Sequence, residues 1–387
     1  MTGYLNTALN DGGTVCLLNL LERLKSDGFN PALLNLTPRD CKPHKDVLEK
    51  ARRGEAKIVS EGRNSMTFYL KDYPFPFAFY FTGVDMKGAY RKHSRKDFNR
   101  LLDEWQKILK EKKTDLTITV EEDIFSMSAA LKFSPVRLHR INSVGIFEKS
   151  RLPHPEEFRR IIPEFIFVCG GKFLKDKLEK YYGMDSINLP PQVAFDSFNS
   201  GETPGEYITM VNGSWHKGLV IFLHLAKNMP GKKFLLAGGK KHLLKKYALP
   251  NIRSVPGPVR DINEIYDMTR VLIAPSLWEE SFGMVIAEAM SRGIPVIAND
   301  TGGVKEAMNG AGFLVEINGK RRGEADFYSN MAYHLGALSS YRKHLLFLDN
   351  CYNYRKESGK ALKAAEAARR RGEEHYTAFR ERVVSLT

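Results

Sequence analysis

One segment of the chain, residues 270–303, constrains the fold more than any other part of it, and it reads RVLIAPSLWEESFGMVIAEAMSRGIPVIANDTGG. Its pattern predicts a strand over 271–275, a polar turn, a helix over 283–292 that a glycine ends, and a second strand over 295–298. Two strands joined through a helix in this way run parallel. The segment therefore predicts an α/β fold with a parallel sheet.

Among the carboxylates of this segment, Glu280 and Glu288 have seven residues between them. Glu280 falls in the loop after the first predicted strand, and Glu288 falls about one and a half turns into the helix. Ligands of open α/β sheets bind at that end of the strands, and the backbone N–H groups of a helix start suit a phosphate. The arrangement favours a nucleotide-activated sugar as ligand. The alternative is a buried unit whose carboxylates are only solvated or capping.

The whole segment resembles the signature of the retaining glycosyltransferases of the GT-B fold, specifically glycosyltransferase family four, the glycosyl transferases group one. Two glutamates with this separation would be weak evidence alone, but the flanking residues are in register as well. The residues that match are Pro275, Ser276, Glu280, Phe282, Gly283, Glu288, Ala289, Met290, Gly293, Pro295, Val296, Ile297, Gly302, Gly303 and Glu306.

The resemblance implies two Rossmann-like, doubly wound α/β domains that face each other across a cleft, with a C-terminal helix that crosses back to the first domain. The length of 387 residues is typical of two domains. Residues 185–206, rich in Pro, Gly, Ser and acidic residues, have the composition of a linker. We therefore expect an acceptor domain over 1–200, a donor domain over 201–365, and the crossing helix over 366–387.

Periodicity predicts the remaining elements. In the first domain we expect strands at 3–9, 32–36, 75–82, 116–120, 136–139 and 162–168, helices at 15–25, 87–113, 124–132 and 173–182, and a loop region at 37–66. In the second domain we expect strands at 207–211 and 233–237, and helices at 218–227, 242–247 and 361–384.

A pair of glycines, Gly12 and Gly13, follows the first predicted strand and precedes a helix. Glycine allows the backbone to approach a phosphate closely. The family has a glycine-rich loop at this place, so the resemblance implies donor binding; a plain turn is the alternative. The sequence is not G-x-G-x-x-G, which argues against a dinucleotide enzyme.

His139 falls near the end of a predicted strand in SPVRLHRINS. The resemblance implies a catalytic histidine that faces the donor sugar and bonds a sugar hydroxyl. A structural histidine is the alternative.

The segment EYITMVNGSWHKGLVIFLHLA matches the first strand and helix of the family's second domain. The resemblance implies that Lys217 contacts the donor diphosphate, where a cation stabilises the departing charge. The family's arginine is absent, because Asn212 occupies its place. Asn212, Ser214 or His216 would then supply the missing donor, or another basic residue would. An ordinary surface lysine is the alternative for Lys217.

The resemblance assigns the other roles in the second domain. Glu280 bonds the sugar hydroxyls and steadies the anomeric centre, and Glu288 takes the ribose hydroxyls. The remaining donor-binding residues are those around the helix start, which hold the diphosphate, and two that bracket the base: Ser281, Phe282, Gly283, Met284, Val285, Gly257 and Val259.

We expect no cofactor and no required metal. Glycosyltransferases of the other major fold hold a divalent cation with Asp-x-Asp, and the nearest candidate here, residues 121–123, is Glu-Glu-Asp in a loop expected to be solvated. Lys217 and the helix-end amides can offset the leaving-group charge instead. The absence of an obvious carboxylate nucleophile in the first domain favours attack by the acceptor from the leaving-group side.

The net charge of +14 has its densest part in residues 87–113, with Arg91, Lys92, Arg95, Lys96 and Arg100 close together. A solvated helix face and docking onto an anionic membrane surface or acceptor are both open. No nucleic-acid-binding module is recognisable.

No signal peptide, membrane-spanning run or cysteine motif is evident, and the four scattered cysteines are expected to be reduced. These features favour a cytoplasmic protein, with peripheral contact at the inner face of the membrane as an option.

These observations together predict a retaining glycosyltransferase that moves a hexose-type sugar from a nucleoside-diphosphate sugar to a hydroxyl acceptor, which is a glycan, a lipid-linked molecule or a small molecule. The alternatives are a catalytically silent sugar-nucleotide or carbohydrate-binding protein of the same fold, and another GT-B enzyme such as a sugar-nucleotide epimerase. An α-glucan phosphorylase is disfavoured, because no pyridoxal-binding lysine context is recognisable.

Overall fold

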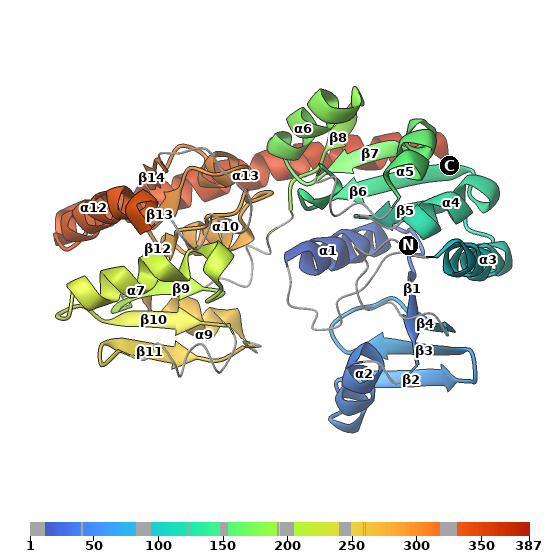
Figure 1. The fold of residues 1–387 in the computed structure, drawn as a ribbon, viewed down its shortest axis with the longest axis horizontal. Helices are drawn as coiled ribbons and strands as arrows, with labels where there is room; N and C mark the ends of the chain where they lie inside the picture. Colours follow the sequence, from blue (N-terminus) through green and yellow to red (C-terminus); the bar gives the residue numbers. More distant parts are fainter. Residues whose placement is uncertain are drawn as a thin grey trace. The chain divides into compact units, whose positions relative to one another are not determined.

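The computed structural model divides into two compact units, the first made of Met1–Gln192 with Glu374–Thr387 and the second of Val193–Glu373. The elements of both are shown in Figure 1. The structure describes residues 12–39, 42–82, 94–121, 124–147, 154–191, 193, 205–239, 249–257, 259, 261–317 and 331–387. Most of the predicted linker lies outside these residues.

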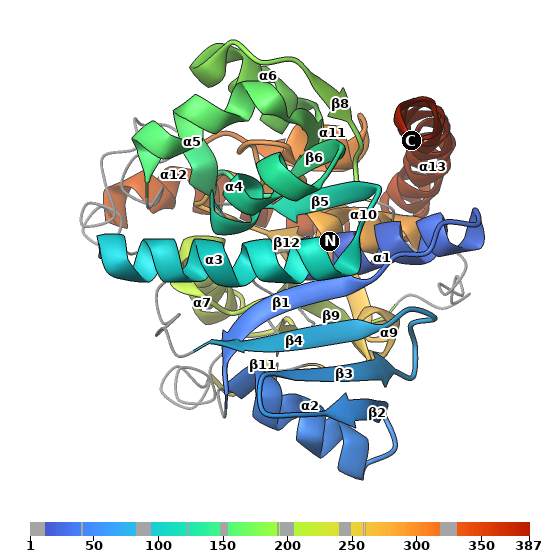
Figure 2. The ribbon, with the colours of Figure 1, turned by 90° about the vertical axis from the view of Figure 1, so that its right-hand side faces the viewer.

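The first unit contains two four-stranded sheets, with strand orders β1-β4-β3-β2 and β5-β6-β7-β8. In Figure 2 the strands of the first sheet lie side by side, with α2 beside β2. The strands are β1 (Leu33–Pro38), β2 (Ala56–Glu61), β3 (Ser65–Leu70), β4 (Phe77–Thr82), β5 (Leu116–Val120), β6 (Val136–Ile141), β7 (Ile166–Cys169) and β8 (Ser186–Asn188). The α-helices are α1 (Gly12–Ser26), α2 (Lys42–Arg52), α3 (Arg95–Lys112), α4 (Ile124–Phe133), α5 (Pro155–Ile161) and α6 (Lys172–Tyr182).

The second of these sheets is parallel throughout, as predicted, and β5 has the bounds that the sequence indicates. The first sheet differs: β1 and β4 are parallel, but β3 runs antiparallel to both β2 and β4. The prediction of a loop over 37–66 is wrong, because this stretch contains α2, β2 and the start of β3. β2 lies at the sheet edge and is mostly exposed, so it lacks the apolar alternation that identifies a strand.

The predicted basic helix is α3, and it begins later than expected, at Arg95. Lys96 and Arg100 are exposed, and Arg100 Nε lies 3.1 Å from a carboxylate oxygen of Glu104. The earlier part of the stretch, 87–93, lies outside the described residues. The described basic side chains are exposed, and both a solvated face and docking onto a membrane or an anionic acceptor stay predictions.

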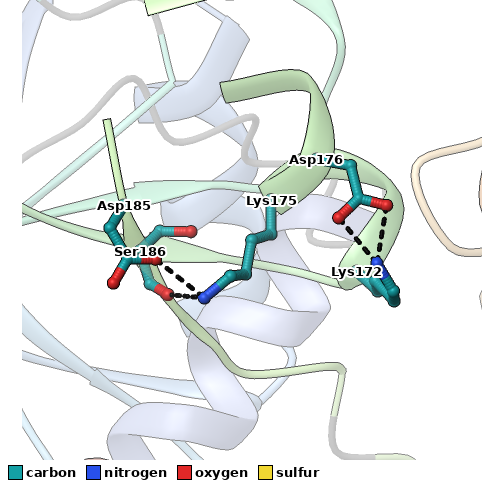
Figure 3. Close-up of polar contacts among 5 residues, drawn as sticks. All are labelled: Lys172, Lys175, Asp176, Asp185 and Ser186. Carbon is teal, nitrogen blue, oxygen red and sulfur yellow. Dashed lines mark hydrogen bonds and ion pairs between the residues drawn. The ribbon is translucent and has the colours of Figure 1, made fainter. Parts of the chain in front are cut away.

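Two contacts of α6 are shown in Figure 3. Lys175 Nζ donates to Asp185 Oδ1 at 2.8 Å and to the Ser186 carbonyl at 2.9 Å, which ties the helix to the start of β8. Lys172 pairs with Asp176 one turn further along the same helix. The bond from Lys175 lowers the pKa of Asp185 below its ordinary value. Because these side chains are largely exposed, the pairs orient the helix but add little stability.

The second unit is built on one six-stranded sheet of order β11-β10-β9-β12-β13-β14, in which every pairing is parallel. The strands are β9 (Tyr207–Val211), β10 (Phe234–Ala237), β11 (Ile252–Val255), β12 (Thr269–Ala274), β13 (Val296–Asn299) and β14 (Phe313–Val315). The α-helices are α7 (Leu219–Asn228), α9 (Ile262–Asp267), α10 (Met284–Ser291), α11 (Val304–Met308), α12 (Met331–Phe347) and α13 (Cys351–Leu386).

This sheet is doubly wound. The chain proceeds from β9 outward to β11, returns to the other side of β9 at β12, and then continues outward to β14. Helices α7 and α12 pack in one core cluster, and α10, α11 and part of α13 pack in another. The predicted strand–helix–strand segment is confirmed as β12, α10 and β13. The predicted helix at 242–247 lies outside the described residues.

Helix α13 contributes side chains to both units. Ala361 and Ala364 lie in a core cluster of the second unit, whereas Tyr376 and Phe379 lie in the core of the first. The Tyr376 hydroxyl donates to Asp27 Oδ2 at 2.7 Å. In the part of the chain that the structure describes, no helix has the length and apolar character needed to cross a bilayer.

The end of α13 should be needed for the stability of the first unit. Phe379 is fully buried, so Phe379→Ala should lower the free energy of unfolding by about 3–5 kcal/mol. Val384 on the same helix is 55% exposed, and Val384→Ala should change it by less than about 0.5 kcal/mol. Urea unfolding of both variants tests this, and equal effects would contradict the packing described here.

Candidate active site of the second unit

The candidate site lies at the carboxyl edge of the six-stranded sheet, where β9 and β12 end side by side. The strand order reverses between these two neighbours, and open α/β sheets bind ligands at such a point. The loop after β9 contains a short 3₁₀ turn, Trp215–Lys217. The loop after β12 contains Glu280. Two loops that are distant in the sequence therefore meet at the edge where a ligand is expected.

Lys217 and Glu280 contact each other. Lys217 Nζ donates to Glu280 Oε1 at 2.6 Å and to Oε2 at 2.8 Å. The side chains are 27% and 17% exposed, so both charges are partly withdrawn from water but still reachable. The structure thus joins two of the three residues that the sequence assigned to catalysis.

The backbones of these two loops are in close contact. Gly218 has φ +87°, and a Cβ atom there would lie 2.0 Å from the Pro275 carbonyl oxygen. The His216 carbonyl accepts hydrogen bonds from the N–H groups of Leu277 and Trp278, at 2.9 and 3.1 Å. Glycine at 218 therefore lets Lys217 lie directly beside the β12 loop.

A third loop, which follows β13, fixes the backbone of Glu280. The Gly303 N–H donates to the Glu280 carbonyl at 2.7 Å. A Cβ atom at Gly302, where φ is +58°, would lie 2.2 Å from that carbonyl oxygen, and one at Gly303 would lie 2.3 Å from the Ser281 carbonyl oxygen. The sequence signature contains both glycines, and the structure shows that close backbone packing requires them.

Two buried polar side chains support the loop after β12, which contains Ser276 and Glu280. Asn299 Nδ2 donates to the Ser276 carbonyl at 3.0 Å, and the Tyr341 hydroxyl donates to Asn299 Oδ1 at 2.9 Å. Asn299 and Tyr341 are fully buried. Sequence reasoning missed both, because Tyr341 comes from α12 and no local pattern connects it to the end of β13.

The predicted phosphate site is the start of α10. Gly283 precedes the helix with φ +105°, and no side chain caps this end. The first internal hydrogen bonds are those of the Ile286 and Ala287 N–H groups to the Gly283 carbonyl. Helix N–H groups before these take no part in the internal bonding of the helix. The Phe282 side chain is buried in the core, so Phe282 could serve a ligand only through its backbone.

Glu288 lies in α10 and has a partner that the sequence did not indicate. The hydroxyl of Tyr266, in α9, donates to Glu288 Oε2 at 2.6 Å. Burial raises the pKa of Glu288, and the bond from Tyr266 opposes that rise. The pKa of Tyr266 is raised well above its ordinary value, mainly by burial, so the phenol keeps its proton.

The other half of the sheet ends in glycine-rich turns. Gly239 has φ +99°, and a Cβ atom there would lie 3.0 Å from the Gly213 carbonyl oxygen. The Gly257 N–H donates to the Gly239 carbonyl at 3.3 Å. Val259, by contrast, packs against an apolar cluster that includes Ile265. The strand ends thus present closely spaced backbone, and base recognition by Gly257 and Val259 stays a prediction.

The position of the family's arginine holds an exposed turn residue. Asn212 has a left-handed backbone, φ 68°, and its N–H donates to the Ala237 carbonyl at 2.7 Å. Ser214 Oγ lies 3.3 Å from His216 Nε2 in the same loop as Lys217. These side chains are near enough in the chain to act with Lys217, but their role as the missing donor stays a prediction.

The position predicted for His139 is wrong. β6 extends beyond His139 to Ile141, and the imidazole is fully buried with Nδ1 2.8 Å from Thr119 Oγ1. Burial lowers the pKa of His139 to about 3, so the ring is neutral. Three rings surround it, with centroids 5.3–6.3 Å away: Phe158, Phe165 and Phe167. The histidine is part of a hydrophobic core and is not presented at a strand end to face a sugar.

Two further predictions concern the first unit. Gly12 and Gly13 are the first residues of α1, so the helix begins earlier than expected; the predicted strand at 3–9 lies outside the described residues, and phosphate binding here stays a prediction. Glu121 is the first residue of the loop expected to be solvated and is partly buried, and residues 122 and 123 lie outside the described residues. The Glu121 carboxylate accepts from Asn142 N at 2.9 Å and Ser143 Oγ at 2.8 Å, and burial raises its pKa.

Among the described side chains, no group of three or more His, Cys, Asp or Glu is arranged to hold a metal ion.

The glycine turn after β13 should be essential to the geometry of the site. Gly302→Ala should lower the free energy of unfolding by about 2 kcal/mol or more, because alanine is strained at this φ and its Cβ meets the Glu280 carbonyl. Gly231→Ala is the control, because a Cβ atom there meets nothing within 4 Å. Thermal unfolding compares the two, and a stable Gly302→Ala protein would contradict the close contact.

Comparison with known proteins finds similarities to the second unit and to the whole chain. Residues 207–326 match the family model described as glycosyl transferases group 1. An uncharacterized 42.6 kDa protein in the cps region of Klebsiella pneumoniae is 34% identical over 98 residues. That match spans 24% of this chain and 26% of the relative, about a quarter of each.

Solved structures match over nearly the whole chain. Sucrose-phosphate synthase from Thermosynechococcus elongatus has a TM-score of 0.68 at 13% identity, covering 99% of both chains. HepE from Anabaena, in complex with UDP and glucose, has a TM-score of 0.66 at 13% identity, also covering 99% of both. Starch synthase IV from Arabidopsis thaliana, bound to ADP and acarbose, has a TM-score of 0.61 at 13% identity, covering 97% of this chain and 98% of that chain. The chain therefore has the GT-B fold, and residues 207–326 of its second unit are similar to the glycosyl transferases group 1 family.

Proposed function

We propose that the protein is a retaining glycosyltransferase that moves a hexose-type sugar from a nucleoside-diphosphate sugar to a hydroxyl acceptor. The observation that carries the proposal is the contact between Lys217 and Glu280 at the point where the strand order reverses. A cation and a carboxylate held together there provide one group for a phosphate and one for sugar hydroxyls. The family match of the second unit supports the same reading.

The diphosphate would bind at the start of α10. The amides around Gly283 and the positive end of the helix dipole suit a phosphate, and Lys217 adds a full charge from the neighbouring loop. These groups stabilise the negative charge that develops as the bond between sugar and phosphate breaks. This arrangement requires no metal ion, and the proposal includes none.

Glu280 would bind the donor sugar. In the structure both of its oxygens accept from Lys217. A diphosphate would attract Lys217 more strongly than one carboxylate does, which would leave Glu280 free to accept hydrogen bonds from sugar hydroxyls. The carboxylate would also stabilise the positive charge at the anomeric carbon, and the acceptor hydroxyl would attack from the side of the leaving group.

Glu288 would bind the ribose of the nucleotide. Its carboxylate lies in α10, after the proposed diphosphate site at the start of that helix. HepE and starch synthase IV were solved with UDP and ADP respectively, which makes these nucleotides sensible first probes here. The acceptor would bind the first unit, and the exposed basic face of α3 suits an anionic acceptor or the inner face of a membrane in the cytoplasm.

A catalytically silent sugar-nucleotide-binding protein is the second candidate. The observation that favours it is Asn212, which stands where the family has an arginine and is exposed in a turn. Such a protein would bind a nucleotide and release no sugar.

Donor turnover distinguishes the two candidates. The purified protein is incubated in EDTA with UDP-, GDP-, dTDP- and ADP-sugars, and free sugar is measured by mass spectrometry and NMR. We expect slow release of the α-anomer from one donor. Glu280→Gln should reduce this rate by about 10²–10³-fold, as expected for loss of an electrostatic contact to the transition state.

The control is Glu206→Gln, a surface change in the same unit at a side chain that is 64% exposed. It should leave the rate unchanged. Nucleotide binding without sugar release would favour the silent protein. The absence of both binding and sugar release with every donor would refute both candidates.

We expect the Glu288 carboxylate to strengthen nucleotide binding and to lower the stability of the folded protein at high pH. Because burial raises its folded pKa, its contribution to stability is present below the unfolded pKa of about 4.5 and is lost as pH rises through the folded pKa. Glu288→Gln removes the buried charge, so its melting temperature should exceed that of the wild type at pH 8. The difference should vanish near pH 4, and nucleotide affinity should fall roughly ten-fold. A lower melting temperature at pH 8 would contradict this account.

A further inference from the structure

We infer that Tyr266 is a positioning residue that holds Glu288 ready for the ribose hydroxyl pair of a nucleotide, so that the site selects ribonucleotides over 2′-deoxyribonucleotides. The inference rests on the proposed role of Glu288 in donor binding. Tyr266 itself need not touch the ligand, because it acts through the carboxylate.

The phenol is held rigidly. Tyr266 is 2% exposed and belongs to the same core cluster as Ile286 and Met290 of α10. Its hydroxyl lies 2.6 Å from Glu288 Oε2 and 3.4 Å from the Val285 carbonyl oxygen. The contact with the carboxylate is the shorter of these two hydrogen bonds. A ring packed in this way cannot follow Glu288 into another rotamer without disturbing the core.

A second set of contacts ties the two helices together one turn further along α10. Arg292 forms an ion pair with Asp267 and donates from Nη2 to Asn263 Oδ1 at 3.1 Å, both in α9. Its guanidinium lies 5.9 Å from the Tyr266 ring centroid. Glu288 and Arg292 are four residues apart and so lie on the same side of the helix. The contact of Tyr266 with Glu288 and the contacts of Arg292 with α9 thus fix the distance between α9 and this turn of α10.

The hydrogen-bond chemistry points to a ligand with neighbouring hydroxyls. An ionised carboxylate only accepts hydrogen bonds, and Tyr266 satisfies one position on Oε2. A ribose offers two adjacent hydroxyl donors for the other positions, whereas a 2′-deoxyribose offers one. Because Glu288 is only partly exposed, a missing donor is not readily replaced by water. Sites built to receive a hydroxyl discriminate strongly against analogues that lack it.

The same hydrogen bond favours the ionised form of Glu288. Among the described titratable groups, Tyr266 is the one that shifts the pKa of Glu288 besides burial itself, and Arg292 acts in turn on Tyr266. Burial raises the pKa of Glu288 and the Tyr266 bond lowers it. Without the hydroxyl the pKa would rise further. Because the charged form accepts the ribose hydroxyls, binding would then be lost at a higher pH as the solution is acidified.

The test compares Tyr266→Phe with the wild type in isothermal titration with the ribonucleoside diphosphate that binds, among UDP, GDP and ADP, and with its 2′-deoxy analogue. We expect the variant to bind the ribonucleotide about ten-fold more weakly and the deoxy analogue almost unchanged. The acid limb of ribonucleotide binding should move to higher pH. In turnover assays KM for the donor should rise while kcat at saturation is retained.

Tyr354→Phe is the matched control, because Tyr354 is a buried tyrosine of α13 whose ring packs on Arg270 outside the proposed site. It should change neither the preference for ribose nor the acid limb. Melting temperatures of both variants show whether each is folded.

Three results would overturn the inference. Equal weakening of both nucleotides in Tyr266→Phe, with an unmoved acid limb, would assign the tyrosine a purely structural role. Loss of ribose preference in Glu288→Gln but not in Tyr266→Phe would reject Tyr266 alone and leave the proposed function intact. Failure of the wild type to bind any nucleotide would reject the proposed function and the inference with it.

Discussion

The close approach of three backbone loops at the carboxyl edge of the second unit's sheet is the constraint on which the candidate site depends. The turn after β9 lies against Pro275, and the turn after β13 lies against the carbonyls of Glu280 and Ser281. At these distances a side chain at Gly218 or Gly302 would collide with backbone. Lys217 and Glu280 are in contact because glycine residues let the backbones of these loops pack directly against one another.

The carboxylate of Glu288 lowers the stability of the folded unit when no ligand is bound. A charge removed from water opposes folding, and the hydrogen bond from Tyr266 offsets only part of that penalty. The hydroxyl groups of a ligand would offset the rest of this penalty by donating hydrogen bonds to the carboxylate. Tyr266 of α9 and Ile286 and Met290 of α10 pack in one buried cluster beside this carboxylate.

Elements with a strong local pattern of residues could be predicted from the sequence. The parallel unit of β12, α10 and β13, the strand β5 and the glycine signature could all be predicted, because their residues are adjacent in the chain. Sequence reasoning failed for β2, an exposed edge strand without alternation, and for His139, whose burial depends on phenylalanines from another part of the first unit. A single histidine carries no local signal that separates a strand end from a core.

The sequence by itself determined the fold class and the spacing of Glu280 and Glu288, since both follow from the pattern along one segment. Only the tertiary structure decided that Lys217 pairs with Glu280 across 63 positions, that Tyr266 holds Glu288, and that Tyr341 supports the end of β13. The physical reason is that hydrogen bonds and burial depend on distances in space. Those distances are set when strands distant in the chain are paired and packed.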